Sequence, residues 1–237
     1  MFSYYGSKSK IVNYYPPPKY DKIIEPFAGS ARYSLKYFDR DVTLVDKCKA
    51  VIDAWLYLIN ASNKDIMSLP KLNPHDNIDN FNLSVGEKSL LSFLVNVGNT
   101  GRKSMTERSF NQFDIQIKNI RSQLFKIRHW NIVFDDYKNL KNIEQTWFID
   151  PPYQYGGNEY KENNKQINFN ELGEWCKIRN GQIIVCENTK ANWLPFLPMI
   201  DMMGSVHKTT EAIWSNHKTN YDAVQQSLQF EKLITNK

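Results

Sequence analysis

The chain has 237 residues, of which 41% are hydrophobic and 23% are charged. This composition suits a globular protein with one α/β domain and an insertion, or with two small lobes. No apolar run approaches the roughly 20 residues of a membrane span, and a net charge of +5 is compatible with nucleic acid without being diagnostic. The three cysteines and four histidines are scattered, which argues against a disulfide framework or a zinc site and predicts a reducing compartment.

The first segment of chemical interest is the loop at residues 2–10, which contains a glycine and two lysines. Backbone N–H groups and a lysine in such a loop can bind a carboxylate or a phosphate, although a frayed terminus has a similar composition. Residues 11–15 predict a short helix or turn, which ends at the three prolines that follow.

A strand, a small-residue turn and a helix are predicted over residues 22–38. Two isoleucines begin the strand, Pro26 ends it, and residues 28–30 (Ala-Gly-Ser) form the turn. This order is typical of nucleotide-binding units. Ala31 and Arg32 stand where a pyrophosphate loop would require glycine, so the pattern favours a cofactor that has an adenosine but no pyrophosphate.

A second strand is predicted at residues 42–45, and Asp46 follows it directly. An acidic residue at this position, about 20 residues after the glycine turn, is well placed to bind the hydroxyls of a ribose. The alternative is that Asp46 caps the N-terminus of the next helix.

The middle of the chain predicts mainly helices. Residues 50–72 carry apolar side chains at helical spacing and are expected in the core, and residues 87–97 form another apolar helix with Ser84 as a possible N-cap. The Asn/Asp-rich residues 73–85 between them are expected to form a loop.

Residues 98–113 are the densest polar segment, mixing Arg and Lys with Asn, Gln, Ser, Thr and two Phe. Such donors suit phosphates and base edges, and an aromatic ring can wedge into a base stack, although a solvated surface loop is equally compatible. Residues 114–128 then predict an amphipathic helix with a basic face.

The remaining strands end in polar residues. Residues 131–134 run into two aspartates, residues 182–186 end in Glu-Asn, and a late strand is predicted at residues 212–217. With a helix near residues 170–179, this alternation predicts a mostly parallel α/β sheet with right-handed crossovers.

The apolar run at residues 147–149 predicts a buried strand that stops at Asp150-Pro151-Pro152-Tyr153. Two prolines cannot continue a strand ladder, and Pro151 holds Asp150 in an extended conformation. A carboxylate and an aromatic ring are therefore expected at the carboxyl end of a strand, which is where ligands bind in open α/β sheets.

Taken in order, these segments resemble the motifs of the Dam-type DNA adenine-N6 methyltransferases. Residues 4–8 are similar to the family's N-terminal motif, and residues 25–30 are similar to its cofactor motif. Asp46 and Asp136-Tyr137 resemble its second and third motifs, and Asp150-Pro151-Pro152-Tyr153 matches the fourth in full. The resemblance covers nearly the whole chain, although Ala31-Arg32 depart from the glycine that usually follows.

The resemblance implies a Rossmann-like methyltransferase sheet with helices on both faces and a small, mainly helical DNA-recognition insert. We expect residues 1–54 and 120–237 to form the catalytic domain and residues 55–119 to form the insert. It implies S-adenosylmethionine as the cofactor, S-adenosylhomocysteine as its product, and double-stranded DNA as the partner. We further expect a monomer or weak dimer without membrane or metal, in a prokaryotic cytoplasm or a host cytoplasm reached by a virus or phage.

The residues expected at the site fall into three groups, of which the resemblance implies the first two and the polar and basic composition of residues 98–128 suggests the third. The catalytic group is Asp150, Pro151 and Tyr153. The group that contacts the cofactor is Tyr4, Lys8, Glu25, Pro26, Phe27, Gly29, Ser30, Asp46, Asp136 and Asp150. The group expected to contact DNA is Asn99, Arg102, Lys103, Arg108, Asn111 and Arg121. Residues 98–113 only loosely resemble the family's recognition hairpin, so the target sequence does not transfer.

The chemistry explains why an acid is needed at position 150. The lone pair of adenine N6 is delocalised into the ring, so the protein must localise it and aim it at the methyl group. The Asp150 carboxylate and the Pro151 carbonyl can accept both N6 hydrogens, and Tyr153 can stack on a base flipped out of the duplex.

Three alternatives stay open at this point. Relatives with Asn in place of the acid methylate glutamine or rRNA bases and those with Ser favour cytosine, so Asp150 favours adenine but does not exclude RNA as the carrier. A non-catalytic DNA-binding relative is the second alternative, although an intact catalytic motif argues against it. The third is a dinucleotide-dependent oxidoreductase, which the absence of a Gly-x-Gly pattern disfavours.

Overall fold

A mixed sheet of seven strands forms the centre of the protein. The computed structural model describes residues 1–2, 8, 11–95, 103–156, 164–203 and 208–217. Within them the strands are β1 (Lys22–Glu25), β2 (Asp41–Asp46), β3 (Asn131–Phe134), β4 (Gln145–Ile149), β5 (Gly181–Asn188), β6 (Leu197–Met203) and β7 (Lys208–Ser215). Their order is β3-β2-β1-β4-β5-β7-β6. Strands β1 to β5 run parallel, and β7 is antiparallel to both β5 and β6, which confirms the mostly parallel sheet.

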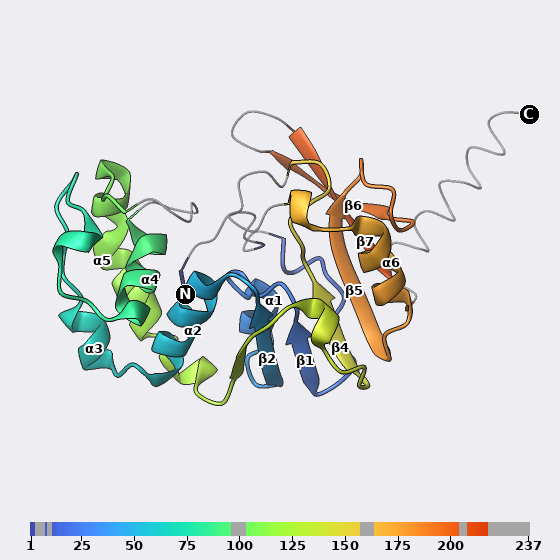
Figure 1. Ribbon diagram of the computed structural model, residues 1–237, viewed down its shortest axis with the longest axis horizontal. Helices are drawn as coiled ribbons and strands as arrows, with labels where there is room; N and C mark the ends of the chain where they lie inside the picture. Colours follow the sequence, from blue (N-terminus) through green and yellow to red (C-terminus); the bar gives the residue numbers. More distant parts are fainter. Residues whose placement is uncertain (3–7, 9–10, 96–102, 157–163, 204–207, 218–237) are drawn as a thin grey trace, which may run out of the picture.

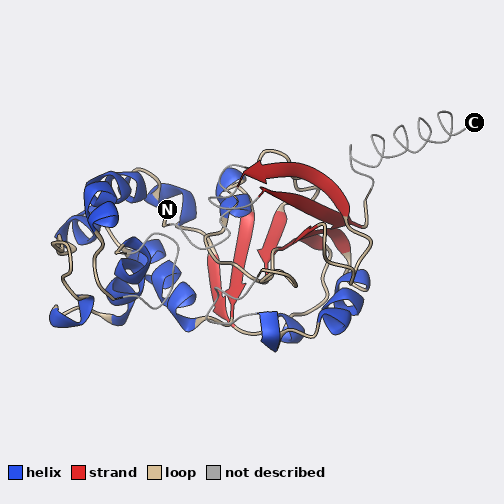
Figure 2. Cartoon of the chain, turned by 90° about the horizontal axis from the view of Figure 1, so that it is seen from above, coloured by secondary structure: helices blue, strands red, loops and turns tan. Residues whose placement is uncertain are grey.

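Consecutive residues of the central strands face two different cores, because side chains alternate across a sheet. Ile23, Leu44 and Phe148 belong to the core that packs with α1 (Arg32–Lys36) and α2 (Lys49–Asn60). Their chain neighbours Ile24, Val45 and Trp147 belong to the core that packs with α6 (Phe169–Lys177). Helices therefore cover both faces of the sheet (Figure 2), and the fold is the α/β Rossmann-like fold expected from the sequence.

Strand β4 lies between β1 and β5, and all five of its residues are buried. A strand in this position needs apolar side chains on both faces, which explains the run Trp147-Phe148-Ile149. Its start is held close to Gly181, where φ is +95° and an added Cβ would lie 2.2 Å from the carbonyl oxygen of Gln145. Only glycine can adopt this backbone conformation at this approach without strain.

Between β2 and β3 the chain forms a group of helices that lies beside the β3 end of the sheet (Figure 1). After α2, the group contains α3 (Asn63–Ser68), the short 3₁₀ helix η1 (Ile78–Asn80), α4 (Val85–Leu94), α5 (Glu107–Arg121) and the 3₁₀ helix η2 (Leu124–Ile127). The predicted N-cap at Ser84 is confirmed: its hydroxyl accepts from the backbone N–H of Glu87, whose carboxylate accepts from the N–H of Ser84. Both predicted domain boundaries fall inside helices, α2 and α5, and the division into domains stays a prediction.

Two predictions about this part of the chain are wrong. The basic helix expected from residue 114 begins at Glu107, because the Thr106 side chain caps it by accepting from Ser109 N–H. Residues 107–113 of the polar segment, for which a surface loop was one of two interpretations, are therefore helical. Helix α5 ends at Arg121, short of the expected residue 128.

Strand β6 was not predicted at all. It contains Pro198 and a register irregularity between Pro198 and Ile200, both of which weaken the alternating pattern by which a strand is found in a sequence. It forms the edge of the sheet, where a proline is tolerated.

Candidate active site

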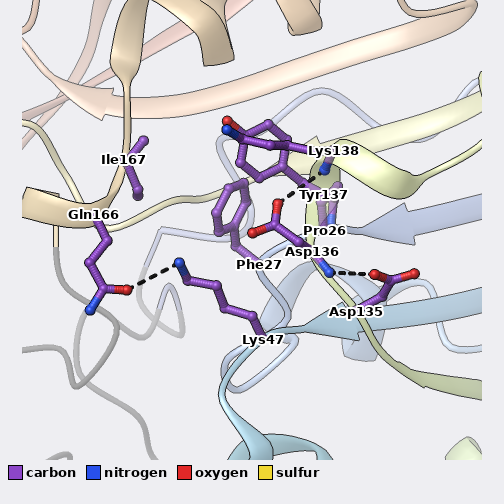
Figure 3. Close-up of a pocket in the computed structure, with 9 residues that line it drawn as sticks. All are labelled: Pro26, Phe27, Lys47, Asp135, Asp136, Tyr137, Lys138, Gln166 and Ile167. Carbon is purple, nitrogen blue, oxygen red and sulfur yellow. Dashed lines mark hydrogen bonds between the residues drawn. The ribbon is translucent and has the colours of Figure 1, made fainter.

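Loops that follow β1, β2 and β3 line a pocket of about 120 Å³ at the carboxyl edge of the sheet (Figure 3). Pro26 and Phe27 follow β1, Lys47 follows β2, and residues 135–138 follow β3. The remaining wall is Gln166 and Ile167, at the end of the 3₁₀ helix η5 (Asn164–Gln166). Parallel strands bring their carboxyl ends to one edge, so three separate stretches of sequence meet here.

The walls of this pocket combine flat apolar surfaces with carboxylates. The rings of Phe27 and Tyr137 have centroids 5.3 Å apart, with 34° between their planes. The Asp136 carboxylate accepts from the backbone N–H of Lys138 at 3.1 Å, and Lys47 Nζ donates to Gln166 Oε1 at 3.2 Å (Figure 3). Such a slot suits a flat ring that carries amino or hydroxyl donors at its edge.

The turn after β1 is fixed by Asp46 at the end of β2. Gly29 has φ of +44°, its N–H donates to Asp46 Oδ2 at 3.1 Å, and its carbonyl accepts from the Trp55 indole at 2.9 Å. Asp46 Oδ1 accepts from the N–H of Cys48, which is the N-cap residue of α2. Asp46 is thus not itself the N-cap, and its carboxylate joins the glycine turn to the start of α2. Its role in binding ribose stays a prediction.

Glu25 lies beneath the same turn rather than in the pocket wall. Its buried carboxyl accepts from the backbone N–H of Ser34 in α1 at 2.8 Å, and burial raises its pKa to about 8. The structure therefore places Glu25 where it supports the turn. Ala31, at the position where the sequence departs from glycine, adopts a left-handed conformation with φ of +47°. That conformation strains a residue with a side chain, and the surrounding turn maintains it.

The second half of the site is a buried cluster around Asp150, just after β4. Lys8 Nζ lies 3.1 Å from Asp150 Oδ1 and 3.4 Å from Glu211 Oε1, and it also bonds the Tyr153 hydroxyl. The hydroxyls of Tyr15 and Tyr153 both donate to Glu211 Oε1. The ammonium of Lys8 and the carboxylates of Asp150 and Glu211 thus lie together, although Glu211 comes from β7, far away in the sequence.

The electrostatics of this cluster follow from burial. Burial raises the pKa of Asp150 to about 6, with Lys8 opposing the shift and the negative charge of Glu211 adding to it. Burial also raises the pKa of Tyr15 and Tyr153 well above the ordinary value, so both phenols are protonated and donate hydrogen bonds at neutral pH. Asp150 is ionised at pH 7 and above and can act as a hydrogen-bond acceptor.

Glu187, near the end of β5, holds the backbone that follows the Asp150 motif. Its two carboxylate oxygens accept from the N–H groups of Gln154 and Asn188, and the indole of Trp193 donates to it at 3.3 Å. Burial raises the pKa of Glu187 to about 7, so it is held partly protonated near neutrality. The Gln154 contact fixes the chain directly after Tyr153.

The structure brings together some of the predicted site residues and separates others. Lys8, Asp150 and Tyr153 meet in the cluster, whereas Pro26, Phe27 and Asp136 line the pocket. Gly29 and Asp46 are bonded to each other in the turn after β1. Ser30 and Pro151 are buried beside these groups in the chain. Tyr4, Asn99 and Arg102 lie outside the described residues.

The predicted DNA-binding residues that the structure describes lie on the helical group and not at the pocket. Lys103, Arg108 and Asn111 are exposed, and Arg121 is half-buried at the end of α5. Lys103 forms an exposed ion pair with Asp79. Their role in binding DNA stays a prediction.

Sequence reasoning missed Glu211 and Tyr15 and gave Glu187 no role. The available signal was an acidic side chain directly before the apolar residues 212–214, because a carboxylate buried beside them must have partners. Those partners are far away in the sequence, with Tyr15 and Glu211 separated by 196 positions, so the pattern alone could not identify them.

No helix in the described part of the chain is long and apolar enough to cross a membrane. The same residues include no group of three or more His, Cys, Asp and Glu side chains that could hold a metal ion.

Comparisons with known proteins give only distant likenesses. No family model matches the chain, and no curated protein matches it. Among solved structures, it is similar to the putative methyltransferase yhhF from Escherichia coli, with a TM-score of 0.38 and 11% identity over 90% of this chain and 81% of that one. A conserved hypothetical protein from Streptococcus pyogenes has a TM-score of 0.33 and 10% identity over 84% and 88% of the two chains.

A third similar structure is the putative methylase HI0767 from Haemophilus influenzae, with a TM-score of 0.35 and 10% identity over 83% of this chain and 87% of that one. At these TM-scores and identities the three proteins identify neither the family nor the substrate of this chain. Its function must therefore be argued from the site itself.

Proposed function

We propose that the protein transfers the methyl group of S-adenosylmethionine to N6 of an adenine flipped out of double-stranded DNA. The supporting observation is that Asp150 lies at the level of the pocket. Ile24 of β1 pairs with Trp147 of β4, and Phe27 and Asp150 each follow their paired residue by three positions. A cofactor held in the pocket and a base held by Asp150 would thus occupy the same edge of two adjacent strands.

The residues around the pocket fit the adenosine part of S-adenosylmethionine. The Phe27 and Tyr137 rings offer flat apolar surface, and the Asp136 carboxylate can accept from an amino group or a hydroxyl. At about 120 Å³ the pocket is smaller than the ~300 Å³ or more of a complete ligand site, so it would hold one end of the cofactor. When bound, the cofactor supplies a methyl group already activated by its sulfonium.

Asp150 acts on the nucleophile rather than on the methyl group. Its ionised carboxylate and the Pro151 carbonyl accept the two N6 hydrogens, which favours a pyramidal nitrogen aimed in line at the methyl carbon. The N6 proton becomes acidic once the new C–N bond has formed. A carboxylate whose pKa is raised to about 6 is then a competent acceptor for that proton.

Tyr153 would hold the flipped base. A methyl group cannot reach N6 inside a duplex, so the base must leave the stack and find a new aromatic surface. Stacking on a tyrosine ring contributes on the order of 1–3 kcal/mol. The Tyr153 hydroxyl is tied to Lys8 and Glu211, which holds the hydroxyl end of the ring in place.

The exposed basic side chains of the helical group would contact the phosphate backbone. Lys103 and Arg108 flank the start of α5, and Asn111 is exposed on its second turn. The exposed Lys103–Asp79 ion pair contributes little to stability, so Lys103 can exchange that partner for a phosphate.

The test is transfer of a tritiated methyl group to unmethylated DNA and to RNA, followed by sequencing with single-base detection of N6-methyladenine. We expect label in DNA at adenines within one short sequence. Label in RNA alone would move the activity to an RNA substrate. Absence of label from both, with no binding of S-adenosylmethionine by calorimetry, would refute the enzyme and favour a non-catalytic DNA-binding protein.

A further inference from the structure

Glu211 is the carboxylate of the Asp150 cluster that belongs to none of the sequence motifs. Its residue is 1% exposed, and its Oε1 atom accepts from both Tyr15 and Tyr153 and lies 3.4 Å from Lys8 Nζ. Burying an ionised carboxylate is costly unless it is paired and hydrogen-bonded. Three partners, of which Lys8 and Tyr15 are buried, converge on one oxygen, which indicates that this carboxylate is held in place for a reason beyond filling the core.

We propose that Glu211 is a positioning residue, which fixes the Tyr153 ring and the Lys8 ammonium relative to Asp150. The inference rests on the proposed function, because Glu211 would act through Tyr153, which holds the flipped base, and through Asp150, which accepts the N6 hydrogens. Tyr153 follows two prolines in a loop, and its hydroxyl is tied to a strand of the sheet through Glu211. Glu211 pairs with Asn188 across the β5–β7 ladder, so the anchor is rigid.

The second effect of Glu211 concerns the charge on Lys8. Asp150 and Glu211 lie 3.1 and 3.4 Å from the same ammonium and share it. Without the Glu211 charge, Lys8 would pair with Asp150 alone, and the catalytic carboxylate would be less available to the N6 hydrogens. Glu211 thus keeps Asp150 accessible as an acceptor by competing with it for Lys8.

These two effects can be separated by substitution. Glu211→Gln keeps the size and an acceptor oxygen for the phenols but removes the charge. Glu211→Ala removes both, and Tyr153→Phe removes the hydroxyl through which Glu211 would hold the ring, together with its bond to Lys8. Tyr15→Phe is the matched control, because it removes one phenol from the same carboxylate oxygen without touching Tyr153.

The experiment measures single-turnover methylation of unmethylated genomic DNA by the full-length protein across pH, with thermal unfolding as a check on folding. We expect Glu211→Ala to slow methylation on the order of 100-fold, as a misplaced catalytic group does, and Tyr15→Phe to slow it much less. With Tyr153→Phe already present, Glu211→Ala should cause a clearly smaller loss than it causes alone.

Glu211→Gln should in addition move the acid limb of the pH–rate profile to lower pH, because the Glu211 charge is one of the factors that raise the pKa of Asp150. If Glu211 did not act on Asp150 through its charge, its neutralisation would leave this limb unmoved. If Glu211→Ala fails to fold, the isosteric Gln variant still provides the test.

Wild-type rate together with an unmoved acid limb in folded Glu211→Gln would overturn the role of Glu211 while leaving the methyltransferase intact. If Glu211→Ala slowed methylation by the same factor with and without Tyr153→Phe, the two residues would act independently. That result would overturn the claim that Glu211 acts through the Tyr153 ring. A wild-type protein that methylates no DNA would overturn the proposed function, and with it the role assigned to Glu211.

Discussion

Lys8 Nζ lies 3.1 Å from Asp150 Oδ1, so a residue of the N-terminal loop is in direct contact with the acid at the end of the central strand. The ammonium partly offsets the burial that raises the pKa of Asp150, and the pKa settles at about 6. The carboxylate is therefore ionised under physiological conditions yet retains a weakly basic character. This balance sets the behaviour expected of position 150 in the following experiments.

Replacing Asp150 by Ala should lower methyl transfer by at least ~100-fold, the loss typical of a removed transition-state contact. Binding of S-adenosylmethionine should be largely retained, because the pocket is lined by residues of other loops. Single-turnover rates and calorimetry of the purified variant check the two halves of the prediction. Wild-type turnover in the variant would show that Asp150 is not a catalytic residue.

The rate should depend on the ionisation of Asp150. The active form is the carboxylate, so kcat/KM should be constant above pH 7 and fall about tenfold per pH unit well below an apparent pKa of about 6. The measurement is a pH–rate profile with a check that the protein stays folded at each pH. A flat profile down to pH 5 would contradict the raised pKa.

The same raised pKa predicts that Asp150→Asn makes the folded protein more stable. A carboxyl whose pKa is higher in the folded than in the unfolded state destabilises the fold above the folded value of about 6, and this effect is lost as the pH falls toward the unfolded value of 3.8. We expect a gain on the order of 1 kcal/mol at pH 7.5 that shrinks by pH 4. Denaturant titrations of both proteins at the two pH values measure it, and an equal or larger gain at pH 4 would contradict it.

Gly181→Ala should strongly destabilise the sheet. The new methyl group would meet the backbone of Gln145 at 2.2 Å, and φ of +95° is unfavourable for alanine. The two effects predict a loss of about 2–5 kcal/mol of unfolding free energy. Gly156→Ala is the matched control, since its φ is +104° but nothing lies within 4 Å of the added methyl group. Equal losses for the two variants would mean that the clash with Gln145 is absent.

Lys103→Ala should weaken binding to DNA of any sequence and reduce the slope of log affinity against log salt by about 1. Lys177→Ala is the control, because Lys177 also forms an exposed ion pair but lies on α6, remote from the helical group (Figure 1). Fluorescence anisotropy over a salt series gives both slopes. An unchanged slope for Lys103→Ala would place the DNA surface elsewhere.

The elements that the sequence predicts well are those whose ends are decided locally. The strands before Pro26 and Asp150 stop because proline cannot continue a ladder, and α4 starts where Ser84 and Glu87 form a capping box. The start of α5 was missed because the polar residues 107–113 bury only one face of the helix, which resembles a loop in composition. Neighbouring residues are enough to predict these strand ends and the start of α4, but they are not enough to predict the start of α5.

The residues of the candidate site divide in the same way. Asp150 and Tyr153 are visible in the sequence because their motif is contiguous, and Asp136 follows a recognisable strand. Glu211 is not visible, because β7 runs antiparallel to β5 and brings a residue from its middle, rather than one after its end, to the carboxyl edge of the parallel strands. Which part of a strand reaches the site depends on strand direction, which is a property of the whole sheet.

The bonds from Tyr15 and Tyr153 to Glu211 also bear on the order in which the protein matures. During synthesis the first fifteen residues and the Asp150 motif leave the ribosome well before β7. Until Glu211 is in place, the phenols of Tyr15 and Tyr153 lack their common acceptor, and Lys8 has Asp150 as its nearer carboxylate. A nascent chain, or one cleaved before residue 208, would thus carry Asp150 and Tyr153 without the carboxylate that bonds the Tyr153 hydroxyl and approaches Lys8.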